Sequence, residues 1–208
     1  MANQKHVVIT GAGPVGTTAA LMLSKAGIKV TILEAENDLL LDMRASTFHP
    51  PTLDILEDLG IVQEIINQGL ITPTFQYRDR QEGLLAEFDM AAVSEHTNHP
   101  YRVQAEQYKL TRIITDMLPS FPDAEVKFNA RATALDQDDS SVTVHYETPD
   151  GPQSITGDYL LSCDGSKGFA RKALNIGFPG FTYPELFLVV STTDDIRESV
   201  PDMNYVAY

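Results

Sequence analysis

The sequence is poor in cysteine and in positive charge, and it has no long apolar run. Cys163 is the only cysteine in 208 residues, so no intrachain disulfide and no cysteine-rich zinc site can form. A total of 15 Lys and Arg against 29 Asp and Glu gives a net charge of -14, which argues against DNA or RNA as a partner. No apolar run approaches the roughly 18 residues that span a bilayer, and the first residues lack a signal-peptide pattern. We therefore expect a cytoplasmic protein that binds neither nucleic acid nor membrane.

The first 36 residues carry the clearest local pattern. Residues 7–10 are predicted to form a buried strand, residues 14–25 a helix that ends at Gly27, and residues 29–33 a second strand. This order predicts a βαβ unit.

The rest of the chain alternates between helical and strand patterns. Residues 52–68 are predicted to form two short helices separated at Gly60, and residues 74–77 and 84–88 a hairpin. Further helices are expected at 107–118 and 169–174, and further strands at 126–129, 132–136, 142–146, 155–162 and 186–192.

A glycine-rich loop joins the first strand to the first helix. In the stretch GAGPVG, Gly11 permits a tight turn, Gly13 lets the backbone approach a pyrophosphate, and Gly16 lets the helix pack on the sheet. The helix N-terminus presents N–H groups and a partial positive charge to the anion. We expect the loop, including Pro14 and Val15, to bind a dinucleotide.

An acidic residue follows the second strand. Glu34 would accept hydrogen bonds from the ribose 2′- and 3′-hydroxyls of an adenosine and would repel a 2′-phosphate. The site at Glu34 and Ala35 is therefore expected to take FAD or NAD rather than NADP. The βαβ unit alone does not decide between FAD and NAD.

Three further stretches carry a family resemblance. They are MRASTFHPPTLDILEDLG (43–60), VQAEQYKLTRII (103–114) and CDGSKGFARKAL (163–174). Together with GAGPVG, and in the same order, they resemble the class A FAD-dependent aromatic hydroxylases related to phenol and p-hydroxybenzoate hydroxylases.

The resemblance implies further cofactor contacts. Arg44 would contact the flavin-side phosphate or ribose, where its planar guanidinium suits a bidentate bond. Gln104 would bind the ribityl or phosphate region. Asp164 and Gly165 would face the cofactor crevice from a strand-to-helix turn. No catalytic residue and no metal ligand is assigned, because the five histidines show no metal or triad spacing.

The resemblance also implies a fold and a reaction. The fold is α/β, a Rossmann-like FAD-binding βαβ fold with a mixed sheet and part of a β-rich substrate lobe. FAD-binding segments would cover residues 1–71 and 101–178, a substrate-lobe hairpin 72–100, and the start of the substrate-lobe sheet 179–208. The family hydroxylates a small aromatic substrate with FAD, O₂ and NADH or NADPH. A homodimer is left open, as are a reductase, a halogenase and a non-catalytic FAD-binding fragment.

One motif of the resembled family is missing. Its members carry a second Gly-Asp pair near a helix start, downstream of the DG motif, whereas the Gly-Asp pair here, Gly157–Asp158, lies upstream of that motif. We therefore expect the chain to be the N-terminal portion of a longer monooxygenase. The strand predicted at 186–192 would then lack sheet partners.

Overall fold

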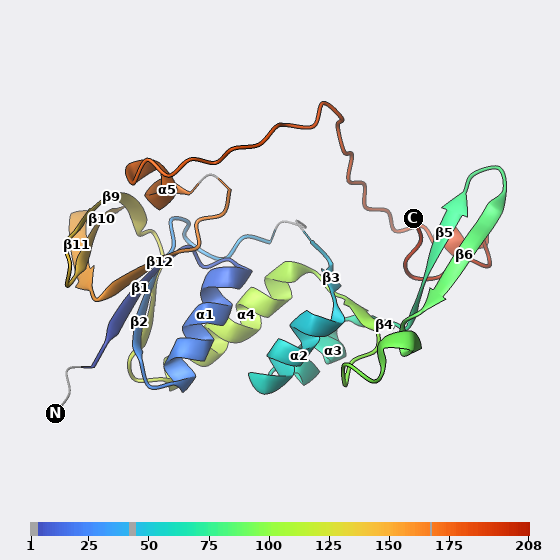
Figure 1. Ribbon diagram of the computed structural model, residues 1–208, viewed down its shortest axis with the longest axis horizontal. Helices are drawn as coiled ribbons and strands as arrows, with labels where there is room; N and C mark the ends of the chain where they lie inside the picture. Colours follow the sequence, from blue (N-terminus) through green and yellow to red (C-terminus); the bar gives the residue numbers. More distant parts are fainter. Residues whose placement is uncertain (1–3, 42–44, 167) are drawn as a thin grey trace.

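A parallel sheet forms the centre of the molecule. The computed structural model describes residues 4–41, 45–166 and 168–208. The four-stranded sheet has the order β12-β1-β2-β8, and its strands are β1 (His6–Thr10), β2 (Lys29–Leu33), β8 (Ala124–Lys127) and β12 (Tyr159–Ser162). Strand β1 pairs in parallel with both neighbours, so that Val7 lies opposite Val30 and Tyr159. Figure 1 shows this sheet at one end of the molecule.

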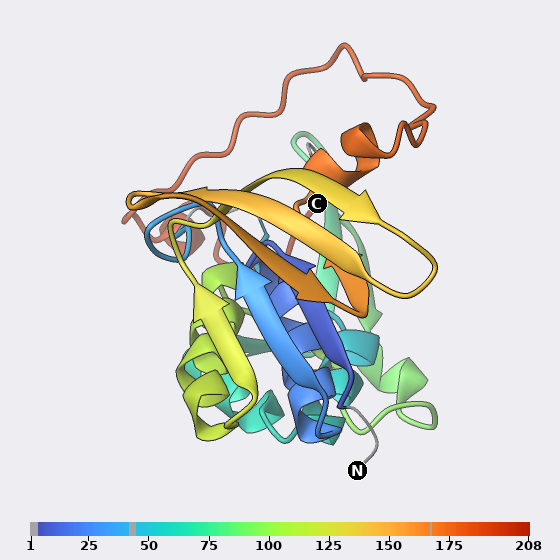
Figure 2. The ribbon, with the colours of Figure 1, turned by 90° about the vertical axis from the view of Figure 1, so that its left-hand side faces the viewer.

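Helices α1 (Pro14–Lys25) and α4 (Gln107–Met117) cover one face of the parallel sheet. An antiparallel sheet of β9 (Arg131–Gln137), β10 (Val142–Thr148) and β11 (Gly151–Gly157) covers the other face (Figure 2). Side chains alternate across β1, so Val7 and Ile9 join the core with the helices while Val8 joins the core with β10. This part of the molecule therefore has three layers and two apolar cores.

A second group of elements continues the helical layer. Helices α2 (Pro50–Asp58) and α3 (Val62–Gln68) pack beside a small sheet of β3 (Thr47–Phe48), β7 (Arg102–Gln104) and β4 (Leu70–Thr72). Leu53, Ile65 and Val103 are completely buried and belong to the same core as α1 and α4. This packing fixes β7 relative to the glycine loop.

A hairpin of β5 (Thr74–Asp79) and β6 (Gly83–Asp89) lies at the opposite end from the parallel sheet (Figure 1). The last residues of the chain run beside β5, where the Gln76 N–H donates to the Val206 carbonyl at 2.9 Å and the Tyr208 N–H donates to the Gln76 carbonyl at 2.9 Å. Arg102 lies 4.1 Å from the centre of the Phe75 ring and donates to the Tyr208 hydroxyl.

The remaining elements are short. They are α5 (Phe169–Ala173) and the 3-10 turns η1 (Met90–Val93), η2 (Leu118–Ser120) and η3 (Ile196–Glu198). None of the helices within the described ranges is long and apolar enough to cross a bilayer.

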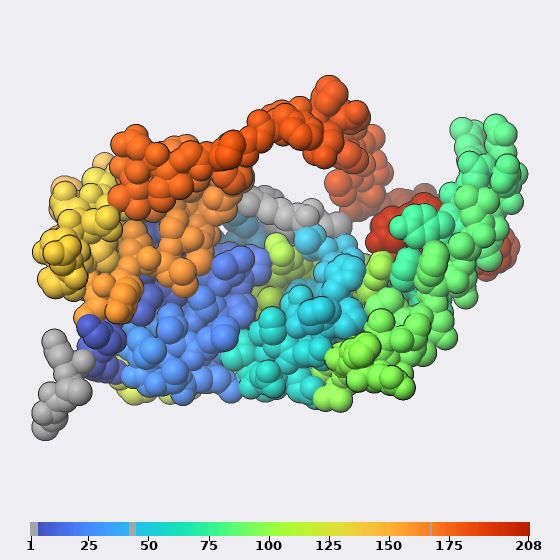
Figure 3. Space-filling model, viewed as in Figure 1, coloured from blue at the N-terminus to red at the C-terminus, as the bar shows by residue number. Residues whose placement is uncertain are grey.

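The predicted strand at 186–192 is wrong. These residues belong to an extended segment that crosses from α5 to the hairpin end (Figures 1 and 3). Leu186, within this segment, is 98% exposed. Side chains that favour β-structure do not by themselves form a strand, because a strand needs a hydrogen-bonded neighbour. No described strand pairs with these residues.

Two other strand predictions need correction. The strand predicted at 155–162 is divided into β11 and β12 at Asp158, whose carboxylate accepts from the His6 N–H and from Lys5. The strand predicted at 126–129 is β8, which ends before Asn129 because that residue adopts a φ of 52°. The other predicted helices and strands are present, while the proposed segment boundaries at 71, 100 and 178 stay a prediction.

Candidate functional site

A cleft of about 430 Å³ opens at the carboxyl ends of β1, β2 and β12. In parallel α/β sheets this edge is where ligands bind. The structure brings most of the predicted site residues to this cleft, namely Gly11, Gly13, Pro14, Val15, Glu34, Ala35, Asp164 and Gly165. Segments that are 150 residues apart in sequence therefore meet around one space.

Gly11 and Gly16 are required by the packing of the protein itself. Gly11 has a φ of 95°, and a Cβ there would lie 2.6 Å from the Cys163 carbonyl oxygen. A Cβ on Gly16 would collide with the Gly11 carbonyl oxygen and would lie 3.3 Å from the Cys163 Cβ. The first turn of α1 can approach the sheet this closely only without these side chains.

Gly13 differs from its two neighbours. A Cβ at this position would meet no atom of the described chain within 4 Å. Gly13 is the N-cap of α1, and within the described ranges α1 has no side-chain cap and no acidic residue in its first turn. The positive end of α1 and its N–H groups therefore face an open space that suits an anion.

Glu34 fastens the tip of β2 to the glycine loop. Its half-buried carboxylate accepts the Ala12 N–H at 2.7 Å and the Glu36 N–H at 3.0 Å, one on each oxygen. A carboxylate offers about four acceptor positions, so each oxygen retains the capacity for a further hydrogen bond. Glu34 can thus hold the loop and accept ligand hydroxyls at the same time.

Asp164 also has a structural role. Its carboxylate accepts hydrogen bonds from the Thr10 hydroxyl, from the Ser162 hydroxyl at 3.1 Å and from the Phe169 N–H at 2.9 Å. It therefore joins the end of β1 to the start of α5, while Gly165, with a φ of 73°, lines the cleft.

Cys163 also lines the cleft and is half-buried. Burial, and secondarily the negative charge of Asp164, raise the pKa of the Cys163 thiol. A raised pKa disfavours the thiolate, which is the reactive form of a cysteine.

Gln104 is set apart from the lining of this cleft. It lies at the end of β7, where its side-chain oxygen accepts from the Thr47 hydroxyl at 2.9 Å. Its Nε2 is buried without a hydrogen-bond partner among the described residues. Arg44 lies outside the described residues.

Several lining residues were not identified from the sequence. Gln107 and Tyr108, in the first turn of α4, line a smaller hollow of about 110 Å³ that also touches Gly13 and Glu34. Their signal was their position at the start of the helix predicted at 107–118, three and four residues after Gln104. Arg131 of β9 also lines the main cleft and donates to Glu36 at 3.1 Å, and no sequence pattern linked it to the glycine loop.

Comparisons with known proteins agree with this geometry. The family model described as FAD binding domain matches residues 4–208. Para-nitrophenol 4-monooxygenase of Pseudomonas sp. (strain WBC-3) is 34% identical over 189 residues, which are 91% of this chain and 47% of that protein. The 6-hydroxy-3-succinoylpyridine 3-monooxygenase HspB of Pseudomonas putida (strain DSM 28022 / S16) is 31% identical over 94% of this chain and 50% of its own length.

A solved structure shows the same arrangement of elements. The crystal structure of p-nitrophenol 4-monooxygenase PnpA from Pseudomonas putida DLL-E4 superposes with a TM-score of 0.83 and 32% identity, over 88% of this chain and 46% of that one. The chain thus spans about half the length of the relatives it matches. From the glycine loop, Glu34 and the match over residues 4–208, we conclude that the chain belongs to the FAD binding domain family.

Proposed function

We propose that the protein containing this chain is an FAD-dependent monooxygenase that hydroxylates a phenolic substrate with O₂ and NADH or NADPH. The observation that carries the proposal is the open space at Gly13, where the uncapped start of α1 and the Glu34 carboxylate face one cleft. The names of the relatives, which are aromatic or heteroaromatic monooxygenases, support the choice of reaction.

The residues of the cleft fit the adenosine diphosphate part of FAD. The N–H groups at the start of α1 would bind the pyrophosphate, because a methyl-sized space is open at Gly13 and no acidic side chain opposes the anion in the first turn. Glu34 would accept the hydroxyls of the adenosine ribose and would repel a 2′-phosphate. This charge repulsion selects FAD over NADP at this site.

The flavin side would lie toward α4 and β7. Gln104 remains a proposed contact of the ribityl or phosphate region from the resemblance. Arg44 remains a proposed phosphate contact from the resemblance. FAD, when bound, supplies the redox chemistry with O₂, and the protein contributes position, exclusion of water and hydrogen bonds.

The aromatic substrate would lie toward the hairpin end of the molecule. Strands β5 and β6 present Phe75, Tyr77 and Phe88, whose rings contact one another, and Tyr208 packs against the same group. We assign this hairpin to the substrate lobe. The chain spans about half the length of the relatives, so the remaining walls of the substrate pocket would come from the part of those proteins that this chain does not match.

The first test is cofactor binding. The purified protein, at its full natural length, should carry the visible flavin absorption bands or regain them on addition of FAD. The reaction is tested by oxidation of NADH and NADPH with a panel of phenols that includes p-nitrophenol, with chromatography of the products. Flavin reduction without a hydroxylated product would favour a reductase, and a requirement for halide would favour a halogenase.

Two further points belong to the proposal. A cytoplasmic location agrees with the single cysteine and with a need for reduced nicotinamide nucleotide. Light scattering of the protein would decide between a monomer and a homodimer.

A further inference from the structure

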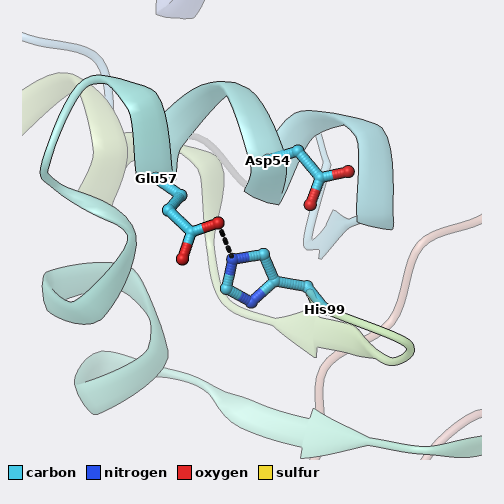
Figure 4. Close-up of side chains that lie close together, drawn as sticks. All are labelled: Asp54, Glu57 and His99. Carbon is cyan, nitrogen blue, oxygen red and sulfur yellow. Dashed lines mark ion pairs between the residues drawn. The ribbon is translucent and has the colours of Figure 1, made fainter. Parts of the chain in front are cut away.

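A cluster of three possible metal ligands lies away from the cofactor cleft. Asp54 and Glu57 are three residues apart on α2, and His99 comes from the loop that precedes β7. Figure 4 shows the three side chains gathered on one side of α2, with His99 directed toward Glu57. Their ligand atoms all lie within 4.8 Å of one another.

The imidazole of His99 is buried and incompletely satisfied. The residue is 6% exposed, and its Nε2 has no hydrogen-bond partner within the described part of the chain. A buried polar nitrogen without a partner carries an uncompensated desolvation cost. A group that binds this nitrogen from the side of Glu57 would remove that cost.

The spacing between His99 and Glu57 suits a shared ion better than a direct bond. The distance from Nε2 to the nearer Glu57 oxygen is 3.5 Å, which is longer than the usual 2.7–3.2 Å of an N–H···O hydrogen bond. Two ligand atoms at about 2.1 Å from a tetrahedral zinc ion lie about 3.4 Å apart. The pair is therefore at the separation that one bound ion requires.

Neighbouring groups hold the three ligands in place. The Thr97 hydroxyl donates to Asp54 at 2.6 Å, and the Asn98 side chain donates to Glu57 at 2.9 Å. The other ring nitrogen of His99 lies 2.9 Å from the Tyr101 hydroxyl. Protein metal sites use such outer contacts to fix the tautomer and orientation of their ligands.

The surroundings favour a cation and leave room for water. Asp54 and Glu57 line an open hollow of about 340 Å³, to which Asp58 and Glu95 add two more carboxylates. A solvent-filled hollow can supply the fourth ligand. Imidazole nitrogen with two carboxylates is a donor set typical of zinc and similar transition ions, whereas calcium and magnesium prefer oxygen ligands throughout.

From this geometry we propose that Asp54, Glu57 and His99 bind one divalent transition-metal ion of the zinc type. The ion joins α2 to the loop before β7 and so fixes the strand that carries Gln104. No sequence pattern indicates this site, because His99 is more than 40 residues from both carboxylates and only the packing of the loop on α2 brings them together.

The test measures metal binding directly. The full-length protein with its cofactor is dialysed against a chelator, and the chelator is then removed by dialysis against buffer. The protein is titrated with ZnCl₂ in a calorimeter and with CoCl₂ while visible absorption is recorded. We expect one equivalent of either metal to bind, with the intense visible bands of four-coordinate cobalt. A large excess of magnesium or calcium should not displace it.

Variants distinguish this site from unspecific binding to an acidic surface. His99→Gln, Asp54→Asn and Glu57→Gln should each weaken zinc binding at least about tenfold. The matched controls are His145→Gln and Asp136→Asn, because this exposed pair, 2.8 Å apart, has the same chemistry elsewhere in the fold. Both controls should bind zinc as the wild type does.

Two results would overturn the proposal. One is a wild-type protein that binds no zinc or cobalt after dialysis, which would leave His99 and Glu57 as a simple ion pair. The other is zinc binding that the three variants leave unchanged. If His99→Gln unfolds, as circular dichroism would show, the two carboxylate variants decide the question, because both keep the shape of side chains that are not fully buried.

Discussion

Two alanine substitutions in the glycine loop should have separable effects. At Gly16 the added methyl group collides with the Gly11 carbonyl oxygen, and such overpacking costs about 1–3 kcal/mol. Alanine recovers about 0.5–1 kcal/mol of helix propensity, so the net loss is at most about 2.5 kcal/mol. For a protein of this size each kcal/mol lowers Tm by about 2–4 °C. Gly16→Ala should therefore lower the Tm of the apoprotein by up to about 10 °C.

At Gly13 the same substitution should leave the fold intact. Its φ of -70° and ψ of 179° suit alanine, and the methyl group meets no described atom within 4 Å. Alanine is a poorer N-cap than glycine but lowers the entropy of the unfolded chain, and these two effects, each about 0.5–1 kcal/mol, nearly cancel. The methyl group occupies the space proposed for the pyrophosphate, so FAD affinity should fall at least about tenfold, or 1.4 kcal/mol.

The assay pairs thermal unfolding with FAD titration. Unfolding is followed on apoprotein, because bound ligand would itself raise Tm, and affinity is followed by the change in flavin fluorescence. Wild-type FAD affinity in Gly13→Ala would refute the placement of the pyrophosphate at α1. An unchanged Tm in Gly16→Ala would show that the loop can relax around the added group.

Three other predictions concern single side chains. Glu34→Ala removes the acceptor of the Ala12 N–H, so FAD affinity should fall at least about tenfold, and an unchanged titration curve would exclude Glu34 from the site. Asp164→Ala removes the acceptor that joins β1 to α5 and should lower the free energy of unfolding by about 1–3 kcal/mol, as measured in urea. Burial, and secondarily the charge of Lys29, lower the pKa of His6 in the folded protein. As pH falls through about 6.5, His6 is therefore protonated in the unfolded chain before it is protonated in the folded one. Stability should therefore decrease from pH 7.5 to 5.5, and the decrease should be smaller in His6→Gln; equal decreases would contradict this.

Local signals in the sequence were sufficient to predict the βαβ unit and the glycine-rich loop within it. The signals for the βαβ unit lie close together in the sequence. They are the glycine spacing, Pro14 at the helix start and Gly27 after its end. The cofactor cleft followed because the carboxyl ends of parallel strands meet at one edge. The family resemblance added the turn at Asp164, which the fold brings beside the loop.

Features that depend on distant partners were not predictable in this way. Residues 186–192 have the side chains of a strand but no described neighbour to pair with. The pairing of Gln76 with Val206, and the approach of His99 to Glu57, arise from the folding of segments that lie far apart in sequence. The spacing of residues in the sequence does not predict such contacts, because the intervening chain fixes neither the distance between the two residues nor their relative orientation.

The position of β1 between β2 and β12 has a consequence for synthesis on the ribosome. Val7 pairs with Val30, which is made soon afterwards, but also with Tyr159. At about 5–20 residues per second, roughly 8–30 s pass before β12 is made. During that time the apolar edge of β1 lacks its second neighbour and is open to pairing with other chains. The nascent protein is therefore most prone to aggregation before residues 159–162 emerge, and chaperones that bind extended apolar segments would act in that interval.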